Sequence, residues 1–163
     1  MMIEISVAEP KHSLLIADLF HEMDAFYGER ENEATEIKAA HINSALFSDP
    51  PFAFSLLAWD QERLVGFACY SFLWPAAGSS KSLFLKELYV RETRRKSGIG
   101  SLLMREIFRV AKENSCSRVE WMTERENIGA RRFYEKLDTS EVRSKIFYRV
   151  EGQASIEKIV SDA

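Results

Sequence analysis

The fold is decided by one stretch, which runs Leu85-Lys86-Glu87-Leu88-Tyr89-Val90-Arg91-Glu92-Thr93-Arg94-Arg95-Lys96-Ser97-Gly98-Ile99-Gly100. The apolar run Leu83–Val90 predicts a β-strand. The basic, glycine-containing residues of Arg91–Gly100 predict a loop. Apolar residues then recur at helical spacing and predict a helix over Ser101–Asn114. A strand therefore enters a glycine-containing loop, and the loop enters a helix.

This loop and the helix that follows it predict an anion site. The first amides of a helix have no partner inside the helix, and the helix dipole favours negative charge there. Gly98 and Gly100 let the backbone approach a phosphate closely and adopt positive φ. Arg95 and Lys96 add full positive charges. The segment therefore predicts a cradle for a pyrophosphate.

Two other phosphate-binding patterns do not fit this loop. The P-loop pattern, G-x-x-x-x-G-K followed by Ser or Thr, is absent. The dinucleotide pattern G-x-G-x-x-G has Leu103 where its third glycine should stand. A helix start with flexible glycines and a solvated basic loop stays open as an alternative if the loop is taken alone.

The rest of the chain predicts an α/β sandwich with a central mixed, largely antiparallel sheet flanked by helices. Its length of 163 residues suits one domain, residues 1–163. Alternating or apolar runs predict further strands at Ile3–Val7, Ser55–Trp59, Leu64–Leu73, Arg118–Thr123 and Lys145–Val150. Helical spacing predicts further helices at 10–28, 34–47, 127–136 and 155–160.

Two local features of these elements are specific enough to test. The first predicted helix has an apolar stripe formed by Leu15, Leu19, Met23 and Phe26. The second and third predicted strands are separated by the polar run Asp60-Gln61-Glu62-Arg63, which predicts a hairpin with a four-residue turn.

Composition excludes several classes of protein. Hydrophobic residues make up 46% and charged residues 29%, which is an ordinary globular balance. The net charge of −3 argues against a nucleic-acid partner. No apolar run approaches the length of a membrane span, so we expect no membrane partner and a cytoplasmic location. Cys69 and Cys116 lie far apart, and the histidines lack metal-ligand spacing, so neither a disulfide framework nor a metal site is expected.

Two motifs together resemble the GNAT superfamily of N-acetyltransferases. The first is Arg95-Lys96-Ser97-Gly98-Ile99-Gly100, which matches the pattern (Arg or Gln)-x-x-Gly-x-(Gly or Ala) and follows a strand. The second is Asn127-x-x-Ala130-x-x-Phe133-Tyr134-Glu135-Lys136, at a fitting distance downstream. The resemblance covers Ile3 to about Val150 and implies the GNAT fold.

Among subfamilies, the chain is most similar to the diamine (spermidine/spermine-type) acetyltransferases and their bacterial relatives. Gly66-Phe67-Ala68-Cys69-Tyr70-Ser71-Phe72 and Lys145-Ile146-Phe147-Tyr148-Arg149-Val150 carry this likeness. It implies an enzyme that transfers an acetyl group from acetyl-CoA, its cosubstrate, to a primary amine, and it implies a homodimer. The expected acceptor is a small diamine, polyamine or amino-acid-like amine.

The resemblance also implies where acetyl-CoA binds. The strand before the loop should splay from its neighbour and bind the pantetheine arm and thioester carbonyl through backbone groups. The implied cofactor-binding residues are Leu88, Tyr89 and Val90 for the pantetheine, Arg95, Lys96, Ser97, Gly98, Ile99, Gly100 and Ser101 for the diphosphate, and Asn127 and Tyr134 downstream. Asn127 is also expected to cap its helix. Asp138, where relatives usually have glycine, is expected in a left-handed helix end.

Acetyl transfer to an amine needs a general base and a general acid. An alkylamine with a pKa of about 10.4 is neutral in only about one molecule in a few thousand at pH 7, so a base must remove its proton. Tyr134 matches the family tyrosine near the cofactor sulfur and is the expected acid. Glu87, on the strand beside the thioester, is the expected base, directly or through a water. Strand alternation places Lys86 and Glu87 on opposite faces.

Several alternatives stay open at this point. Glu87 is either the base or a solvated or salt-bridged residue. If the base belongs at the Lys86 position, a water chain or another residue must take its place. The acidic residues Glu22, Asp24, Glu29, Glu31 and Glu33 form either a polyamine pocket or a solvated face. Protein amines or aminoglycosides are alternative acceptors, and a noncatalytic acyl-CoA-binding module is an alternative class.

Overall fold

A computed structural model describes residues 2–29 and 33–161. The chain divides into two compact units, Met1–Met122 and Thr123–Ala163. The first unit contains the predicted strand, loop and helix of the anion site. The second contains the downstream motif with Asn127 and Tyr134.

The first unit is built on a mixed sheet, as predicted. Over the described residues it has five strands in the order β1-β2-β3-β4-β5. Their bounds are β1 (Ile3–Val7), β2 (Phe54–Asp60), β3 (Arg63–Leu73), β4 (Ser82–Val90) and β5 (Arg118–Trp121). Neighbouring strands are antiparallel except β4 and β5, which are parallel. Since β4 and β5 are joined through a helix, their parallel pairing follows from that crossover.

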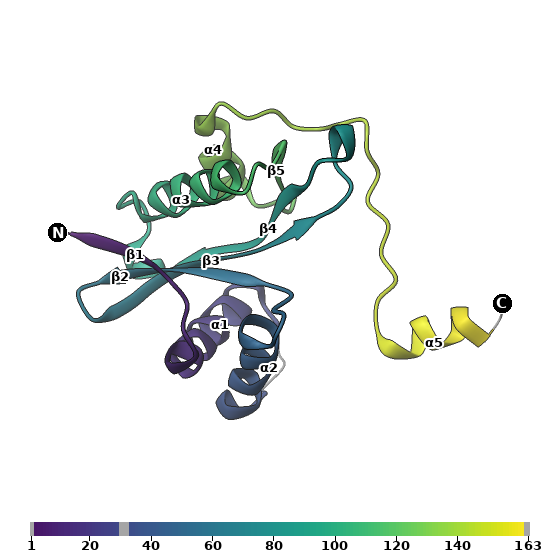
Figure 1. Cartoon of the computed structure of the whole chain (residues 1–163). Helices are drawn as coiled ribbons and strands as arrows, with labels where there is room; N and C mark the ends of the chain where they lie inside the picture. The colour runs from purple at the N-terminus through teal and green to yellow at the C-terminus, as the bar shows by residue number, and fades with distance from the viewer. Residues whose placement is uncertain (1, 30–32, 162–163) are drawn as a thin grey trace. The chain divides into compact units, whose positions relative to one another are not determined.

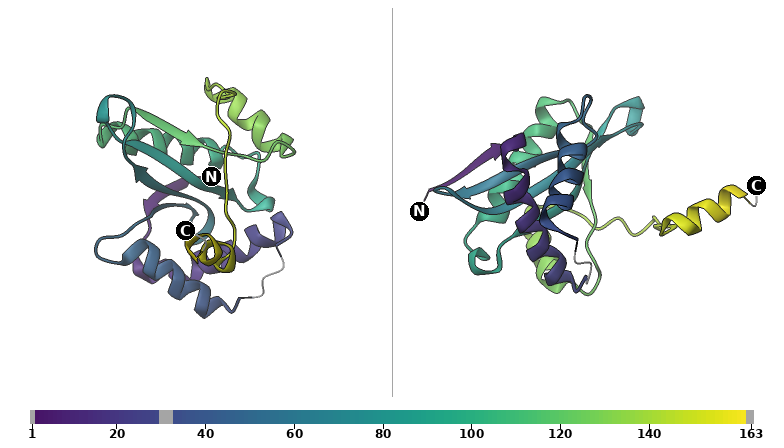
Figure 2. Two further views of the ribbon diagram at one scale, coloured as in Figure 1. Left: turned by 90° about the vertical axis from the view of Figure 1, so that its right-hand side faces the viewer. Right: turned by 90° about the horizontal axis from the view of Figure 1, so that it is seen from below.

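Helices cover both faces of this sheet. The first unit contains α1 (Ser13–Tyr27), α2 (Thr35–Phe47) and α3 (Ile99–Glu113), with short 3-10 turns η1 (Pro10–His12), η2 (Ala77–Ser79) and η3 (Glu92–Arg94). The helices α1 and α2 lie on one face of the sheet and α3 lies on the other (Figure 1). The two further views show α1 and α2 packed side by side (Figure 2). The prediction of a sheet flanked by helices is therefore confirmed.

The buried face of α1 differs from the predicted stripe. Ile16, Leu19 and Met23 are buried against the sheet, whereas Leu15 is 44% exposed and Phe26 is 49% exposed. The predicted stripe was wrong at these two positions. Two neighbouring faces of this helix both include Leu19, and the elements that pack against the helix decide which of the two faces is buried. About half of the Phe26 side chain is therefore outside the core, where it can contact residues of other elements.

The hairpin between β2 and β3 is tighter than predicted. Both strands extend by pairing Asp60 with Arg63, so the turn consists of Gln61 and Glu62 only. Gln61 takes a φ of 56°, the left-handed conformation that such short turns require. The prediction of a four-residue turn was therefore wrong, although the hairpin itself is confirmed.

The second unit contains α4 (Ile128–Tyr134), the 3-10 turn η4 (Glu135–Leu137) and α5 (Gln153–Ser161). Asn127 caps α4, since its side-chain oxygen accepts a hydrogen bond from the amide of Ala130 at 3.0 Å. Asp138 has a φ of 52°, which confirms the expected left-handed helix end.

The prediction of a strand at Lys145–Val150 was wrong, because these described residues form no strand. A strand forms in a sheet only when the backbone of another segment pairs with it. An alternating sequence does not determine which segment that is. Among the described residues, no helix is long and apolar enough to cross a membrane.

Candidate active site

Strand β4 has an edge with no strand partner near its C-terminal end. The parallel ladder between β4 and β5 ends where Leu85 lies opposite Trp121. Strand β4 nevertheless continues to Val90, where it still pairs with β3 through Gly66. Over the described residues, the other edge of β4 is therefore left without a strand after Leu85. This agrees with the expected splay of this strand.

Strand alternation decides which backbone groups face that edge. The amide of Arg91 donates to the carbonyl of Val65 on β3 at 2.9 Å, so Arg91 points its amide toward β3. Successive residues of a strand point their amides to opposite edges. The amides of Leu88 and Val90 therefore face the open edge, whereas that of Tyr89 faces β3. A ligand laid along β4 meets peptide groups at every second residue.

The β4–α3 loop has the backbone geometry of an anion cradle. Lys96 and Gly98 both take left-handed conformations, with φ of 61° and 86°. The amide of Leu102 donates to the carbonyl of Gly98 at 3.1 Å and begins the hydrogen bonding of α3. The amides of Ile99, Gly100 and Ser101 precede that bond, so they have no acceptor within the helix. They are suited to bind a phosphate at the start of α3.

Two arginines of the loop are bound by protein carboxylates. Arg91 forms an ion pair with Glu22 of α1, and its Nε also donates to the carbonyl of Leu64 at 2.9 Å. Arg94 forms an ion pair with Asp60 at the end of β2. These contacts tie the loop to two different elements of the first unit.

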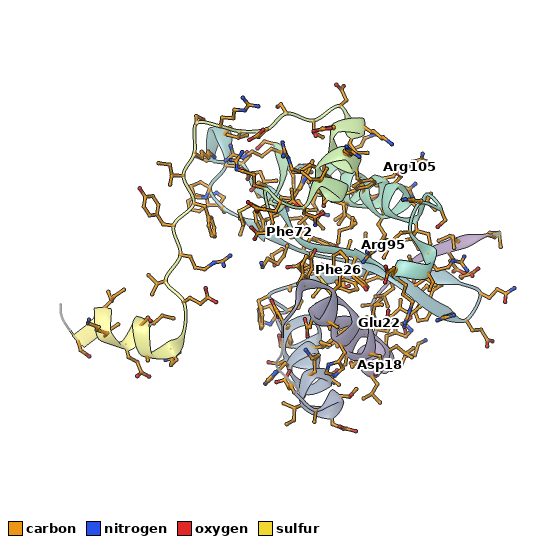
Figure 3. The ribbon with its side chains drawn as sticks, turned by 180° about the vertical axis from the view of Figure 1, so that it is seen from behind. Asp18, Glu22, Phe26, Phe72, Arg95 and Arg105 are labelled. Carbon is orange, nitrogen blue, oxygen red and sulfur yellow. The ribbon has the colours of Figure 1, made fainter. Side chains whose placement is uncertain are left out.

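Arg95 contacts two aromatic rings that also contact each other, with their centroids 6.3 Å apart. Its guanidinium carbon lies 4.0 Å from the ring centre of Phe26 and 5.3 Å from that of Tyr89. Its Nε donates a hydrogen bond to the carbonyl of Val90 at 3.0 Å. Figure 3 shows Glu22 and Phe26 following one another along α1, with Arg95 beside Phe26. The side chain predicted to bind diphosphate thus also has protein partners.

Glu87 is partly buried on β4, with 33% of its side chain exposed. Burial raises the pKa of its carboxyl; Lys86 opposes this rise, and the negative charges of Glu29 and Asp24 add to it. A carboxylate with a raised pKa is a better proton acceptor than an ordinary one. Partial burial and a raised pKa therefore suit Glu87 to act as a general base.

The strand alternation from which we predict opposite faces for Lys86 and Glu87 is interrupted in the structure. Cys69 pairs with Glu87 and the next residue of β3, Tyr70, pairs with Leu85, so Lys86 is an extra residue that forms a β-bulge. The bulge interrupts strand alternation, and Lys86 Nζ lies 3.6 Å from the Glu87 carboxylate.

Cys69 lies opposite Glu87 in the sheet and is unsuited to be a nucleophile. Burial raises the pKa of its thiol to about 12, a rise that Glu87 supports and a hydrogen bond with Ser55 opposes. The thiol donates to the Ser55 hydroxyl at 3.4 Å. A thiol with this pKa stays protonated at neutral pH. Among the described residues, no group of three or more His, Cys, Asp or Glu side chains is arranged to hold a metal ion.

Most of the acidic residues near the end of α1 have partners. Glu22 pairs with Arg91, and Asp24 accepts a hydrogen bond from Lys38 at 2.5 Å. Glu33 lies 3.0 Å from His41. Glu29 and Asp24 are near enough to Glu87 to raise its pKa. Glu31 lies outside the described residues.

The predicted site residues fall in both units. Glu87, the β4 backbone and the loop Arg95–Ser101 lie together in the first unit. Tyr134 is the last residue of α4 in the second unit, where its ring lies 5.1 Å from that of Phe133. The pairing of Tyr134 with Glu87 as acid and base stays a prediction.

Sequence reasoning did not identify Phe26 as a site residue. Its helical spacing assigned it to the core stripe, and its contact with Arg95 joins segments far apart in the chain. The available signal was its position in the last turn of the helix, two residues before Gly28, where an apolar stripe extends beyond the core.

The family model for the GNAT acetyltransferases matches residues 16–138, and the chain belongs to this family. The integron cassette protein VCH_CASS6 from the mobile metagenome of V. cholerae is 28% identical, with a TM-score of 0.89 over 98% of each chain. The structure of AAC(6')-Iy in complex with the bisubstrate analogue CoA-S-monomethyl-acetylneamine is 20% identical, with a TM-score of 0.72, over 93% of this chain and 100% of that one. At this identity the second likeness shows the fold alone.

A curated relative is L-ornithine N5-acetyltransferase NATA1 of Arabidopsis thaliana, which is 26% identical over 98 residues. That match spans 59% of this chain and 43% of the relative, less than half of its length. Together with the structural likenesses, it agrees with the GNAT fold.

Proposed function

We propose that this chain is an acetyl-CoA-dependent N-acetyltransferase that transfers an acetyl group directly to the primary amine of a small molecule. The observation that carries the proposal is the juxtaposition on β4 of an open strand edge, a partly buried Glu87 and the anion cradle that leads into α3. Membership of the GNAT acetyltransferases supports the same reaction.

The residues of the first unit fit a coenzyme A thioester. The edge amides of Leu88 and Val90 suit the pantetheine arm, whose amides hydrogen-bond as a neighbouring strand would. The cradle from Arg95 to Ser101 suits the diphosphate. Tyr89 differs from Leu88 and Val90, because its amide faces β3 and its side chain is 5% exposed and belongs to the core. We propose Asn127 as a further contact to the pantetheine.

The proposed chemistry divides proton transfer between two side chains. Glu87, directly or through a water, accepts a proton from the ammonium group and releases the amine as a nucleophile. The amine nitrogen attacks the thioester carbon, and an amide at the open edge of β4 stabilises the negative charge that develops on the carbonyl oxygen. The carbon–sulfur bond then breaks, and Tyr134 donates a proton to the departing thiolate. The nitrogen loses its second proton to solvent, which also returns a proton to the Tyr134 phenolate, so the products are the neutral amide and the free thiol. The protonated thiol of Cys69 agrees with direct transfer without a covalent acyl-enzyme.

The proposed acceptor is a diamine, a polyamine or an amino-acid-like amine. Glu29 and Asp24 both act on Glu87 electrostatically, and Asp24 and Glu87 each also have a lysine partner. We propose that a second ammonium group of the acceptor is attracted to these carboxylates. The name of the relative NATA1, an L-ornithine N5-acetyltransferase, agrees with an amino-acid-like acceptor. Aminoglycosides, protein amines and a noncatalytic acyl-CoA-binding role are the alternatives.

The acceptor is tested with a panel of diamines, polyamines, ornithine and lysine, aminoglycosides and peptides. Each is incubated with acetyl-CoA and the full chain, and the acetylated product is identified by mass spectrometry. We expect acetylation of the first two classes or of the amino acids. Acetylation confined to aminoglycosides or peptides would reject the proposed acceptor while retaining the enzyme.

We also propose that the chain forms a homodimer through its second unit. Ile146, Phe147 and Tyr148 are 77%, 61% and 85% exposed, in a segment whose sequence is suited to a strand. A second copy would supply the missing strand partner and cover these side chains.

Light scattering on the full chain, with a protomer mass of 18.8 kDa, tests the dimer. We expect twice the protomer mass for the wild type and a single protomer for Phe147→Asp, because a buried, unpaired charge is costly. A monomeric wild type would reject this proposal. The cytoplasmic location and the absence of nucleic-acid and membrane partners stay predictions from composition.

A further inference from the structure

We infer that Phe26 is a positioning residue for the acetyl-CoA site and that it acts through Arg95. This inference rests on the proposed function, because it assigns a role in acetyl-CoA binding to a side chain outside the cofactor motif. Phe26 lies on α1, and only the folded first unit brings it to the loop.

The exposure of Phe26 is the first observation. At 49% exposure, this aromatic side chain on the last turn of α1 contributes less to the core than Leu19 or Met23. One side of its ring faces the Arg95 guanidinium at 4.0 Å, a distance at which cation–π attraction is effective. A large apolar side chain that is only half buried is thus placed against a charged side chain of the loop.

Arg95 transmits this contact to the backbone of β4. Its Nε donates to the Val90 carbonyl at 3.0 Å, on the peptide edge that we assign to the pantetheine. A planar guanidinium has fixed donor directions, so the plane in which Arg95 is held sets the direction of this hydrogen bond. Tyr89 contacts the same guanidinium at 5.3 Å. Phe26 therefore helps to fix both Arg95 and the end of β4.

Glu22 strengthens the connection between α1 and the loop. Glu22 and Phe26 are four residues apart and lie on the same side of α1. Their partners Arg91 and Arg95 are also four residues apart and lie on either side of η3. One side of α1 therefore contacts both ends of η3. Asp18, one turn before Glu22, continues the same side of α1 (Figure 3).

The test compares Phe26→Ala, Phe26→Leu and Phe26→Tyr with the wild type, using calorimetry for acetyl-CoA binding and steady-state kinetics. Phe26→Ala and Phe26→Leu should raise both Kd and KM for acetyl-CoA by about 3- to 10-fold, the range expected for a lost cation–π contact, with kcat at saturation nearly unchanged. Phe26→Tyr keeps an aromatic face and should restore wild-type affinity. Leu14→Ala, at another exposed position of α1, is the matched control and should leave Kd unchanged.

A double-mutant cycle with Arg95→Lys tests whether Phe26 acts through Arg95. Lysine retains the positive charge and loses the planar group. If Phe26 acts through Arg95, Phe26→Leu in the Arg95→Lys background should add almost nothing to the loss in affinity. Full additivity, or wild-type affinity in Phe26→Leu, would overturn the inference. A wild-type chain that does not bind acetyl-CoA would instead overturn the proposed function, so the two failures are distinguishable.

Discussion

The two segments that carry the family motifs are held in different ways. In the β4–α3 segment, Ser82–Glu113, the loop arginines contact Glu22, Asp60 and Phe26, which belong to other elements of the first unit. In the second unit, residues 138–152 carry large apolar side chains that are exposed, such as Tyr148 at 85%. The first segment therefore has its geometry imposed by the surrounding fold, whereas the second carries the exposed apolar surface that we assign to the proposed dimer.

Loss of the proposed base should have the largest effect. Glu87→Gln keeps the size of the side chain and removes its basic oxygen, so kcat/KM for the amine should fall by about 10²- to 10⁴-fold. Acetyl-CoA affinity, measured by calorimetry, should stay within about twofold of wild type because binding of the thioester does not need this proton acceptor. Activity close to wild type would show that Glu87 is a solvated residue and that another group removes the proton.

A methyl group at Gly66 should have the next largest effect. A Cβ there would lie 2.8 Å from the Tyr89 carbonyl oxygen, and that backbone atom belongs to the strand that forms the site. Gly66→Ala should lower the unfolding free energy by about 2 kcal/mol and weaken acetyl-CoA binding. Denaturant titration gives the first quantity and calorimetry the second.

Gly129→Ala is the matched control for Gly66 in the second unit. A Cβ at this position has only an ordinary contact, 3.7 Å from the Asn127 side chain, and alanine favours a helix. We expect unchanged or slightly increased stability for Gly129→Ala. Equal losses at Gly66 and Gly129 would contradict the contrast between the two segments.

Backbone strain at Gly98 should have a smaller effect. Its φ is 86° and its Cβ position is open space, so Gly98→Ala imposes a left-handed conformation without a clash. We expect a loss of about 1–2 kcal/mol in unfolding free energy, with Gly98→Asn less affected because asparagine tolerates this conformation. Gly152, with a φ of 84° and open space, is the equivalent position in the second unit. Gly152→Ala should leave acetyl-CoA binding unchanged, whereas Gly98→Ala should weaken it.

Removal of the Lys86 charge should have the smallest effect, on the pH dependence of the rate. A general base works when deprotonated, so kcat/KM should rise as the pH rises through the pKa of Glu87. The positive charge of Lys86 lowers that pKa against the effect of burial. Lys86→Met should therefore shift the acidic limb of the pH–rate profile to higher pH. An unchanged limb, or a shift to lower pH, would show that the limb does not belong to Glu87.

The parts of the fold that were predicted from sequence depend on local signals. The strand β4, its loop and α3 were predicted because glycine, charge and helical spacing act within a few residues of one another. The Asn127 cap and the left-handed Asp138 were predicted for the same reason. Strand pairing is harder to predict, because it depends on residues far away in the chain. Lys145–Val150 has the sequence pattern of a strand but forms none, since its own residues do not determine a pairing partner.

The candidate site shows the same division between local and distant information. The cradle at Gly98 follows from its motif, whereas the β-bulge at Lys86 arises from the pairing of two strands and overrides simple alternation. The contact between Phe26 and Arg95 depends on how α1 packs on the sheet, so periodicity alone assigned Phe26 to the core.

Thiol release from acetyl-CoA tests the central claim most directly. The wild-type chain is assayed with and without each amine, with Tyr134→Phe in parallel and acetyl-CoA binding measured separately by calorimetry. We predict tight binding and amine-dependent thiol release that Tyr134→Phe strongly reduces. Binding without release from any amine would indicate an acyl-CoA-binding module, and absence of acetyl-CoA binding by the folded wild-type chain would contradict the account.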